Sequence, residues 1–419
     1  MHSSEPRDEG VRGKDMKAAI LGYGTVGSGV ASVLENNSDV VAKSAGEQIS
    51  VKYILDLREF PGDPNEDKVV HDIQVILDDP EVETVVETMG GVEPAFTFVS
   101  RALTSGRNVA TSNKELVAKH GAELMELAAA HKVNFFFEAS VGGGIPVLRA
   151  VEESLTADHI QKISGILNGT TNYMLTKMKN EGASYDQVLR QAQENGYAER
   201  DPAADVEGYD ACRKLAILTS MVCGKQVDFE DIPTEGITKL TGVDFAYAKA
   251  MKGDIKLLGS SFMTEDGVFA RVAPEIISDQ SPLYSVNDVY NAVMFTGDML
   301  GDVMLYGKGA GSLPTASAVV SDVIQTARNR GKTVPAAWKK DRLALADSRD
   351  FCCRFLVRIK GEPGSDLQEL KKALGGAKLL RPEGMDGEYG LVTGPMKAGE
   401  LEEVCSGIEG FISRMYIKD

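Results

Sequence analysis

Short apolar runs alternate with amphipathic stretches along the first 145 residues of the chain. The apolar runs have the length of buried strands and lie at 17–21, 49–55, 84–88, 108–110 and 134–138. The amphipathic stretches have helical spacing and lie at 26–34, 71–79, 94–106 and 115–131. Strands that alternate with helices form βαβ units, so this part predicts an α/β domain over 16–145 with a Rossmann-type, doubly wound parallel sheet.

The pattern changes after residue 145. Strand-like runs at 159–166, 268–274 and 289–295 lie among helical stretches, one of which covers about 205–224. This mixture predicts an α+β domain over 146–300, where we expect the substrate to bind. Residues 301–345 contain the glycine-rich loop GKGAGSLPTASA and a helix at about 314–330. We expect this segment to return to the first domain, and a plain connector between domains is the alternative.

The two ends of the chain differ in character. Residues 350–419 hold a strand, a helix, two strands, a helix and a final strand in that order. The order βαββαβ is the ferredoxin-like plan, which we expect for this segment. Residues 1–15 are polar and lack the hydrophobic core of a signal peptide, so we expect a disordered tail there.

A glycine-rich turn, GYGTVG, follows the first expected strand and opens the first expected helix at residues 22–27. Strand, turn and helix in this order predict a dinucleotide site, with a purely structural turn as the alternative. Gly22 permits the tight turn, Gly24 lets the backbone approach a pyrophosphate, and Gly27 lets helix and strand pack closely. The start of the helix adds amide donors for the phosphates.

The expected strand at 49–55 runs into Asp56 and Arg58, two residues that bear on the choice of coenzyme. An acid at this place binds the ribose hydroxyls of NAD, whereas a nearby arginine accommodates the 2′-phosphate of NADP. Asp56 favours NAD and Arg58 favours NADP, so the sequence leaves the choice of coenzyme open.

Composition narrows the class of protein. The chain has 419 residues and a net charge of −17, which repels phosphate backbones and argues against a nucleic-acid partner. It contains no apolar run of 18 residues, so we expect no membrane span. The five cysteines are odd in number and form no CxxC motif, which favours reduced cysteines in a cytoplasmic protein.

The densest cluster of charges lies in the stretch GYAERDPAADVEGYDACRK at 196–214. Asp210 and Lys214 are four residues apart, and Glu207 is expected on the same helix face. A loop acid, Glu199, together with this acid and lysine is able to hold a zwitterionic amino acid and offer a proton. A solvated ladder of salt bridges is the alternative, and the spacing leaves both open. None of the five histidines lies beside a glycine turn or an acid cluster, so acid–base chemistry falls on Lys, Asp, Glu or water.

Two further candidates follow strands of the first expected sheet. Lys114 lies just past a strand end, where ligands gather in open α/β sheets, and a solvated lysine at a helix start is unfavourable. Glu138 precedes the segment ASVGGGIP, whose backbone carbonyls are suited to coordinating a hard cation such as sodium. A flexible hinge between domains is the alternative for that segment.

Six ordered motifs resemble the homoserine dehydrogenases of the monofunctional bacterial type, which carry a C-terminal ACT domain. They are GYGTVG, TSNKELVA, FFFEASVGGGIP, GILNGTTNYML, GYAERDPAADVEGYDACRKLAIL and GKGAGSLPTASAVVSD, and they span nearly all of 16–345. The resemblance implies reversible, NAD(P)-dependent reduction of L-aspartate 4-semialdehyde to L-homoserine, a step in threonine, methionine and isoleucine biosynthesis.

The resemblance also implies roles for individual residues. Lys214 would pass a proton to the aldehyde oxygen with Asp210 as its acidic partner, and Glu199 would bind the substrate's amino group. Lys114 would lie between cofactor and substrate. The remaining implied positions are a sodium site at Glu138, Val141, Gly143 and Ile145, and cofactor contacts at Gly24, Thr25, Val26, Thr88 and Gly309.

Further expectations concern partners and regulation. The resemblance implies a homodimer or homotetramer built through the substrate domain, and a threonine effector at the ACT-like segment, near the turn at 361–364. A tail that only stabilises the dimer is the alternative. Two other functions stay open: a dehydrogenase for another small amino-acid aldehyde or hydroxy acid, and a non-catalytic amino-acid sensor. The presence of Lys114, Glu199, Asp210 and Lys214 argues against the sensor.

Overall fold

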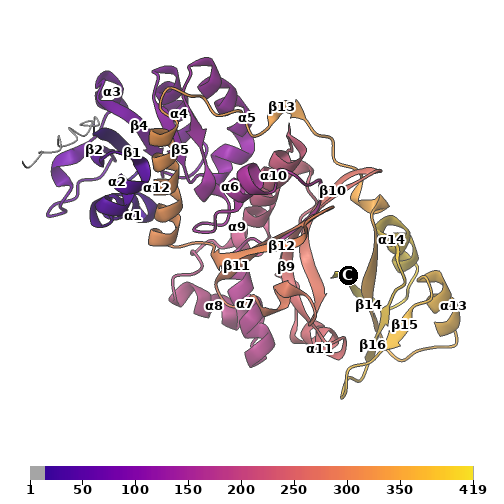
Figure 1. Ribbon diagram of the computed structural model, residues 1–419. Helices are drawn as coiled ribbons and strands as arrows, with labels where there is room; N and C mark the ends of the chain where they lie inside the picture. Colours follow the sequence, from indigo (N-terminus) through magenta and orange to yellow (C-terminus); the bar gives the residue numbers. More distant parts are fainter. Residues whose placement is uncertain (1–14, 419) are drawn as a thin grey trace, which may run out of the picture. The chain divides into compact units, whose positions relative to one another are not determined.

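The computed structural model describes residues 15–418, which fall into two compact units (Figure 1). The first unit comprises the chain up to Leu116, with Glu123–Ala139 and Gly311–Ala336, and the second comprises Val117–Ala122, Ser140–Ala310 and the chain from Ala337 onward. The tail expected at 1–15 lies, except for Asp15, outside the described residues.

The first unit is built on a six-stranded sheet with the order β3-β2-β1-β4-β5-β6, in which all neighbours are parallel. Its strands are β1 (Met16–Leu21), β2 (Ile49–Leu55), β3 (Val69–Val70), β4 (Val82–Glu87), β5 (Asn108–Thr111) and β6 (Phe135–Phe136). The order reverses between β1 and β4, which is the mark of the doubly wound fold. The expected Rossmann-type sheet is confirmed, although β6 is shorter than expected because a 3-10 turn follows at Glu138–Ser140.

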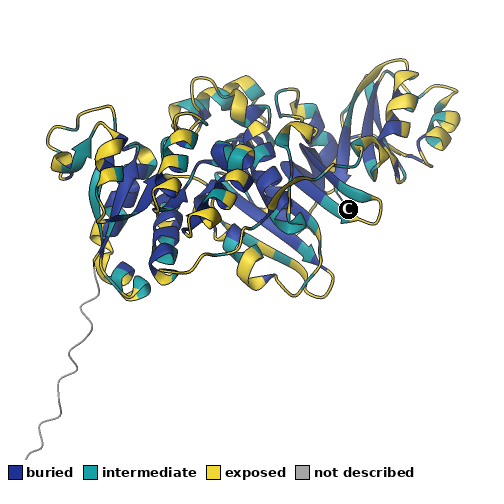
Figure 2. Ribbon diagram, turned by 90° about the horizontal axis from the view of Figure 1, so that it is seen from above, coloured by how far each residue is buried: buried dark blue, intermediate teal, exposed yellow. Residues whose placement is uncertain are grey.

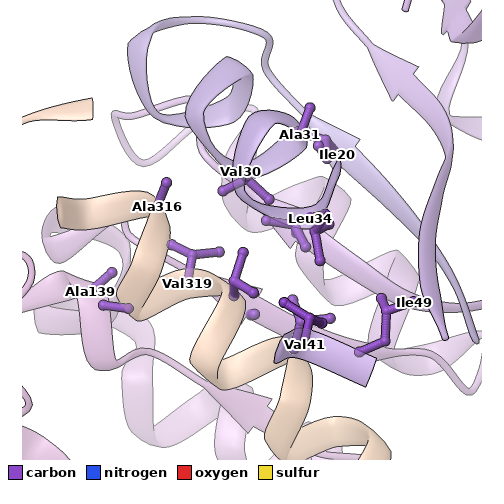
Figure 3. Packing of buried hydrophobic residues seen from close by; sticks show 14 of the residues in the cluster. Ile20, Val30, Ala31, Leu34, Val41, Ile49, Ala139, Ala316 and Val319 are labelled. Carbon is purple, nitrogen blue, oxygen red and sulfur yellow. The ribbon is translucent and has the colours of Figure 1, made fainter. Parts of the chain in front are cut away.

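Six helices belong to this sheet: α1 (Thr25–Asn36), α2 (Ser38–Ala45), α3 (Ile73–Asp78), α4 (Ala95–Thr104), α5 (Lys114–Ala130) and α12 (Ser312–Arg328). Although α12 is distant in the sequence, it packs directly against α1. Figure 3 shows Val30 and Leu34 of α1 facing Ala316 and Val319 of α12 in a shared hydrophobic core. The glycine-rich segment after residue 301 therefore leads into a helix of the first unit.

The second unit contains a ten-stranded mixed sheet with the order β12-β11-β7-β9-β10-β18-β14-β16-β15, and β17 also pairs with β14. Its strands are β7 (Ile160–Ile166), β9 (Gly253–Thr264), β10 (Gly267–Ser278), β11 (Tyr290–Gly297), β12 (Gly301–Lys308), β14 (Cys352–Lys360), β15 (Lys378–Leu380), β16 (Glu388–Val392), β17 (Met396–Lys397) and β18 (Phe411–Lys418). Figure 2 shows its central strands largely buried. Short strands β8 (Lys225–Gln226) and β13 (Lys339–Arg342) pair separately. Strands β9 and β12 were not expected from the sequence.

The second unit also contains helices, some of which pack directly on this sheet. They are α6 (Val147–Arg149), α7 (Gly169–Glu181), α8 (Tyr185–Glu194), α9 (Ala203–Val206), α10 (Tyr209–Cys223), α11 (Gly242–Ala250), α13 (Leu367–Ala373) and α14 (Ala398–Ser406). The single helix expected at about 205–224 is wrong at its start. Gly208 adopts the left-handed conformation with φ +84° and separates α9 from α10.

The last seventy residues follow the expected βαββαβ order. Strands β18-β14-β16-β15 form the sheet, and α13 and α14 pack on it over a core that includes Phe355, Leu391 and Leu401. The last strand also pairs in parallel with β10, with Glu275 opposite Tyr416, so this segment extends the sheet of the preceding part. In residues 15–418, no helix is long and apolar enough to cross a membrane.

Candidate active site

The turn at 22–27 is shaped by close backbone packing. Gly22 has φ +90°, its N–H donates to Leu55 O at 2.8 Å, and Thr88 Oγ1 donates to the Gly22 carbonyl at 2.8 Å. A Cβ atom on Gly27 would lie 2.0 Å from Gly22 O, so only glycine fits there. A Cβ on Gly24 would meet nothing within 4 Å, which leaves open space beside the backbone. The turn is tight where the fold needs it and open where a ligand would approach.

Asp56 and Arg58 form one unit at the end of β2. Asp56 Oδ2 accepts from the backbone N–H of Tyr23 at 2.8 Å, which ties the strand end to the glycine turn. The Arg58 guanidinium donates to both carboxylate oxygens of Asp56 at 2.9 Å, and the Arg58 side chain remains 61% exposed. These hydrogen bonds hold the pKa of Asp56 well below its usual range. The carboxylate is therefore already neutralised by a cation that faces solvent.

A buried glutamate organises the carboxyl ends of β4 and β5, and the sequence analysis did not single it out. Glu87 is fully buried, shares a 2.5 Å hydrogen bond with Thr111 Oγ1, and accepts from the N–H of Met89 at 2.7 Å. Burial raises its pKa. Beside it, Asn113 accepts from the N–H of Leu116 and so caps α5, whose first residue is Lys114. An acid at the end of a buried strand next to the topological switch point was the available signal.

Lys214 and Asp210 form a buried ion pair on α10. Lys214 Nζ donates to Asp210 Oδ2 at 2.7 Å and to the carbonyl of Leu167 at 2.8 Å. Lys214 is 8% exposed and Asp210 is 3% exposed, so this pair is not the solvated ladder that the sequence left open. Asp210 lies in the first turn of the helix, where the helix dipole favours a carboxylate.

Asn168 completes this pair from a different part of the chain. It caps α7 directly after β7, with its side-chain oxygen accepting from the N–H of Thr171 at 2.8 Å. Its amide nitrogen donates to Asp210 Oδ2 at 2.9 Å and to Asp205 Oδ1 at 2.7 Å. The sequence analysis gave Asn168 no role, although it lies in the motif GILNGTTNYML. The available signal was an asparagine at a strand-to-helix junction, a position that favours helix capping.

The other acids of the 196–214 stretch lie differently. Glu207 is the residue that ends α9, so the expectation that it shares one helix face with Asp210 and Lys214 is wrong. The physical reason is the left-handed Gly208, which breaks the helical repeat between them. Glu199 is exposed in the loop before α9, and Gln193 donates to its backbone carbonyl at 3.1 Å.

The segment after β6 forms a tight glycine turn. Gly142 and Gly143 have φ of +76° and +55°, and a Cβ on Gly143 would lie 2.5 Å from Gly309 O. Val141 and Ile145 are buried in the second unit, and Glu138 is buried in the first. Within residues 15–418, no group of three His, Cys, Asp or Glu side chains is placed to hold a metal ion. A cation here would therefore depend on backbone carbonyls with one carboxylate.

The glycine-rich loop after β12 meets buried polar groups. A Cβ on Gly309 would lie 2.1 Å from the Asn291 side chain, so the loop packs directly on that residue. In the first unit, Ser312 Oγ at the start of α12 donates to the carbonyl of Thr25 at 2.6 Å. The end of this loop is thereby joined to the dinucleotide turn.

Family models match both parts of the chain. The NAD-binding domain of homoserine dehydrogenase matches residues 22–138, and the homoserine dehydrogenase model matches residues 146–324. The chain is 40% identical to the homoserine dehydrogenase of Bacillus subtilis over 84% of this chain and 83% of that protein. It is 44% identical to the one of Synechocystis over 74% of this chain and 72% of that protein.

Solved structures give the same result. The structure of a homoserine dehydrogenase from Thiobacillus denitrificans matches with a TM-score of 0.90 and 34% identity, over 97% of this chain and 99% of that chain. A hyperthermophilic archaeal homoserine dehydrogenase in complex with NADPH matches with a TM-score of 0.64 and 25% identity, over 77% of this chain and all of that chain. The chain therefore belongs to the homoserine dehydrogenase family and is an NAD(P)-dependent oxidoreductase.

Proposed function

We propose that this enzyme interconverts L-homoserine and L-aspartate 4-semialdehyde, and that Lys214 carries the proton transfer. The observation that supports this most directly is the buried Lys214–Asp210 pair, held by Leu167 O and Asn168. A buried lysine needs such partners to stay charged, because burial alone favours the neutral amine. An ammonium held in this way is placed to act on an oxygen that gains charge.

The nicotinamide, when bound, supplies or accepts the hydride at the carbonyl carbon. The chain's own groups then handle the charge on the oxygen. The Lys214 ammonium stabilises the developing alkoxide and donates a proton to it in the reducing direction, and its neutral amine takes the proton back in the oxidising direction. Asp210 stabilises the charged form of Lys214, and Asn168 orients Asp210 by donating to the same carboxylate oxygen.

Glu199 and Lys114 complete the proposed set. The Glu199 carboxylate is exposed, as a group must be that receives the ammonium of an amino-acid substrate. Lys114 is half-buried at the start of α5, at the carboxyl edge of the first sheet where α/β folds bind their ligands. Its cationic side chain suits an oxygen of substrate or cofactor.

For the coenzyme we propose that NADP is accepted through Arg58. The turn residues Gly22, Gly24, Thr25, Val26 and Gly27 would hold the pyrophosphate, with Thr88 and Gly309 as further contacts. Because Arg58 already neutralises Asp56 and stays exposed, the local charge suits a 2′-phosphate. NAD would bind at the same place, since it needs only the contact between Asp56 and its ribose hydroxyls.

Three further features belong to this proposal. A sodium ion would be held by the Glu138 carboxylate and by carbonyls of Val141, Gly143 and Ile145, and the tight glycine turn at Gly142 and Gly143 supports this proposal.

Threonine would bind at the ACT-like segment, at the turn of residues 361–364 between β14 and α13. The enzyme would act in the cytoplasm as a homodimer or homotetramer.

Lys214→Ala tests the central role. Because general acid–base groups contribute roughly 10²–10⁴-fold, we expect kcat for L-homoserine oxidation to fall by about that factor. Glu207→Gln is the matched control, since it removes a charge seven residues away at the end of α9 and should leave kcat unchanged. Wild-type turnover in Lys214→Ala with normal circular dichroism would overturn the assigned role.

The substrate and the effector need a separate experiment. Turnover is measured with a panel of small hydroxy amino acids and hydroxy acids, with each coenzyme and with or without threonine.

A further inference from the structure

A cavity of about 860 Å³ lies on the ten-stranded sheet of the second unit. None of the residues assigned above to substrate, coenzyme or cation binding lines it. Its walls come from several strands and from the loop after β10, and they include Lys162, Ser278, Met294, Thr296, Asp302 and Lys418. The pairing of β7, β10, β11, β12 and β18 in the sheet therefore brings these residues together.

Two lysines, Lys162 and Lys418, line this cavity and lie close to each other. Lys418, near the end of β18, donates to Ser164 Oγ on β7 at 2.7 Å, and Lys162 lies two residues earlier on β7 with its Nζ 5.2 Å from the ring centre of Phe262. Among residues 15–418, neither lysine forms an ion pair with a carboxylate. Burial and the nearby charge of Lys162 lower the pKa of Lys418 to about 7.

The neighbouring carboxylates are occupied by other partners. Glu275, the acid whose charge reaches Lys418, accepts from Arg271 Nε at 3.1 Å and from Ser260 at 3.2 Å. Asp302 lines the cavity but accepts from Thr296 Oγ1 at 2.6 Å and is exposed. Among the described residues that line the cavity, the two lysines therefore outnumber the single carboxylate, Asp302.

We propose that this cavity binds a small oxyanion, a carboxylate or a phosphate, between the ammonium groups of Lys162 and Lys418. The hydroxyl of Ser281 lines the same space and can donate to an oxygen of the anion. Met251, Met294 and Pro282 form the apolar part of the wall, which accommodates the carbon body of a small carboxylate. Ligand binding here goes beyond the dehydrogenase reaction and needs none of its residues.

The site lies on a strand that serves the active site. β7 carries Lys162 and Ser164 and runs directly into Leu167 and Asn168, which hold Lys214 and Asp210. The measurement of anion binding should therefore not depend on activity, because an effect on turnover would have more than one explanation.

Calorimetry on the full chain tests the proposal. Saturating NADP fills any phosphate contacts of the coenzyme site, and sodium phosphate or sodium succinate is then titrated against sodium chloride of equal ionic strength. We expect one saturable event with phosphate or succinate and none with chloride, and whichever of the two anions binds identifies the source. Lys162→Gln and Lys418→Gln should each weaken binding by roughly ten-fold or more, because each removes a charge-assisted hydrogen bond.

Lys378→Gln is the matched control, since it removes the same charge from an exposed site on β15 outside the cavity and should bind as wild type. Trace acetylation of lysines, read by mass spectrometry, provides a second measurement in which the anion should protect Lys162 and Lys418 but not Lys378. Equal protection by chloride, or unchanged binding in Lys162→Gln, would overturn the proposal. Protection without added anion that disappears on dilution would also overturn it, because a second copy of the chain would then occupy the cavity.

Discussion

The three glycines of the turn at 22–27 meet different physical demands. Gly27 has no room for a side chain, since a Cβ would lie 2.0 Å from the carbonyl of Gly22. A Cβ atom on Gly24 would meet no protein atom within 4 Å. A side chain there would instead enter the space in which the coenzyme is proposed to approach the backbone. The same residue type thus meets a packing demand of the fold at Gly27 and leaves room for the proposed approach of the coenzyme at Gly24.

Gly27→Ala and Gly24→Ala separate these demands. We expect Gly27→Ala to lower the free energy of unfolding of the first unit by at least about 1–3 kcal/mol, the usual result of overpacking. Gly24→Ala should keep the thermal midpoint but raise KM for the coenzyme several-fold, by roughly 1 kcal/mol of lost binding. Thermal melts and coenzyme titrations of both variants check this. An unchanged KM in Gly24→Ala would show that the backbone does not approach the coenzyme there.

The proposed preference for NADP depends on the side chain of Arg58. Arg58→Ala removes the exposed cation beside Asp56, so we expect KM for NADP to rise roughly ten-fold while KM for NAD changes little. The control is Arg101→Ala, because Arg101 is an exposed cation on α4 that donates to Gln74. Steady-state kinetics with both coenzymes give the comparison. An equal loss with NAD and NADP would mean that Arg58 only supports the turn.

At the element scale, the start of α10 depends on one backbone conformation. Gly208 has φ +84° and interrupts the helical conformation that follows from α9. Tyr209 therefore begins a new helix, with Asp210 in its first turn. A Cβ at Gly208 would also meet Thr234 at 3.0 Å and Val272 at 3.2 Å. The direction of α10, and with it the Lys214–Asp210 pair, therefore rests on this residue.

Gly208→Ala should lose stability and activity together. The left-handed conformation costs a non-glycine residue about 1–2 kcal/mol, and the contacts with Thr234 and Val272 add to this. Gly182→Ala is the matched control, because Gly182 has φ +64° after α7 but a Cβ there meets nothing within 4 Å. We expect both variants to melt earlier and only Gly208→Ala to lose kcat. Equal kcat in the two variants would show that α10 tolerates a shift of its first turn.

At the scale of the whole molecule, the C-terminal segment is part of a larger sheet. β18 pairs with β10, and Arg271 of β10 lies over the ring of Tyr416 at 4.2 Å while it also pairs with Glu275. Removing this segment would leave β10 as an open edge and uncover a buried ion pair. The segment therefore contributes to the stability of the sheet in the second unit.

Deleting residues 350–419 should consequently destabilise the rest of the second unit. An exposed edge strand promotes association, so we expect aggregation on light scattering and a lower thermal midpoint rather than a merely deregulated enzyme. Tyr416→Ala is a milder form of the same change, and it should lower the midpoint without removing the segment. A truncated protein that stays monodisperse with an unchanged midpoint would show that β10 does not need β18.

Much of the first unit could be predicted from the sequence, because its signals are local. Alternating apolar runs and helical stretches predicted β1, β2, β4 and β5, and the GYGTVG motif is a signal contained within six consecutive residues. The pairing of Asp210 with Lys214 needs only one helical turn. The βαββαβ order of the last segment was predicted for the same reason.

Tertiary structure decided the rest. β9 was not predicted, because its Lys256 and Ser260 are buried polar residues whose partners, Val286 and Glu275, lie far along the chain. Asn168 reaches Asp210 across 42 residues, and Lys418 reaches Ser164 across 254, so no local pattern reveals either contact. The sequence by itself determined most elements of the first unit, the element order of the last segment and the chemical groups available. Which charges are buried and which groups meet was decided only by the packing of distant strands, since burial and hydrogen bonding depend on neighbours that the sequence does not place side by side.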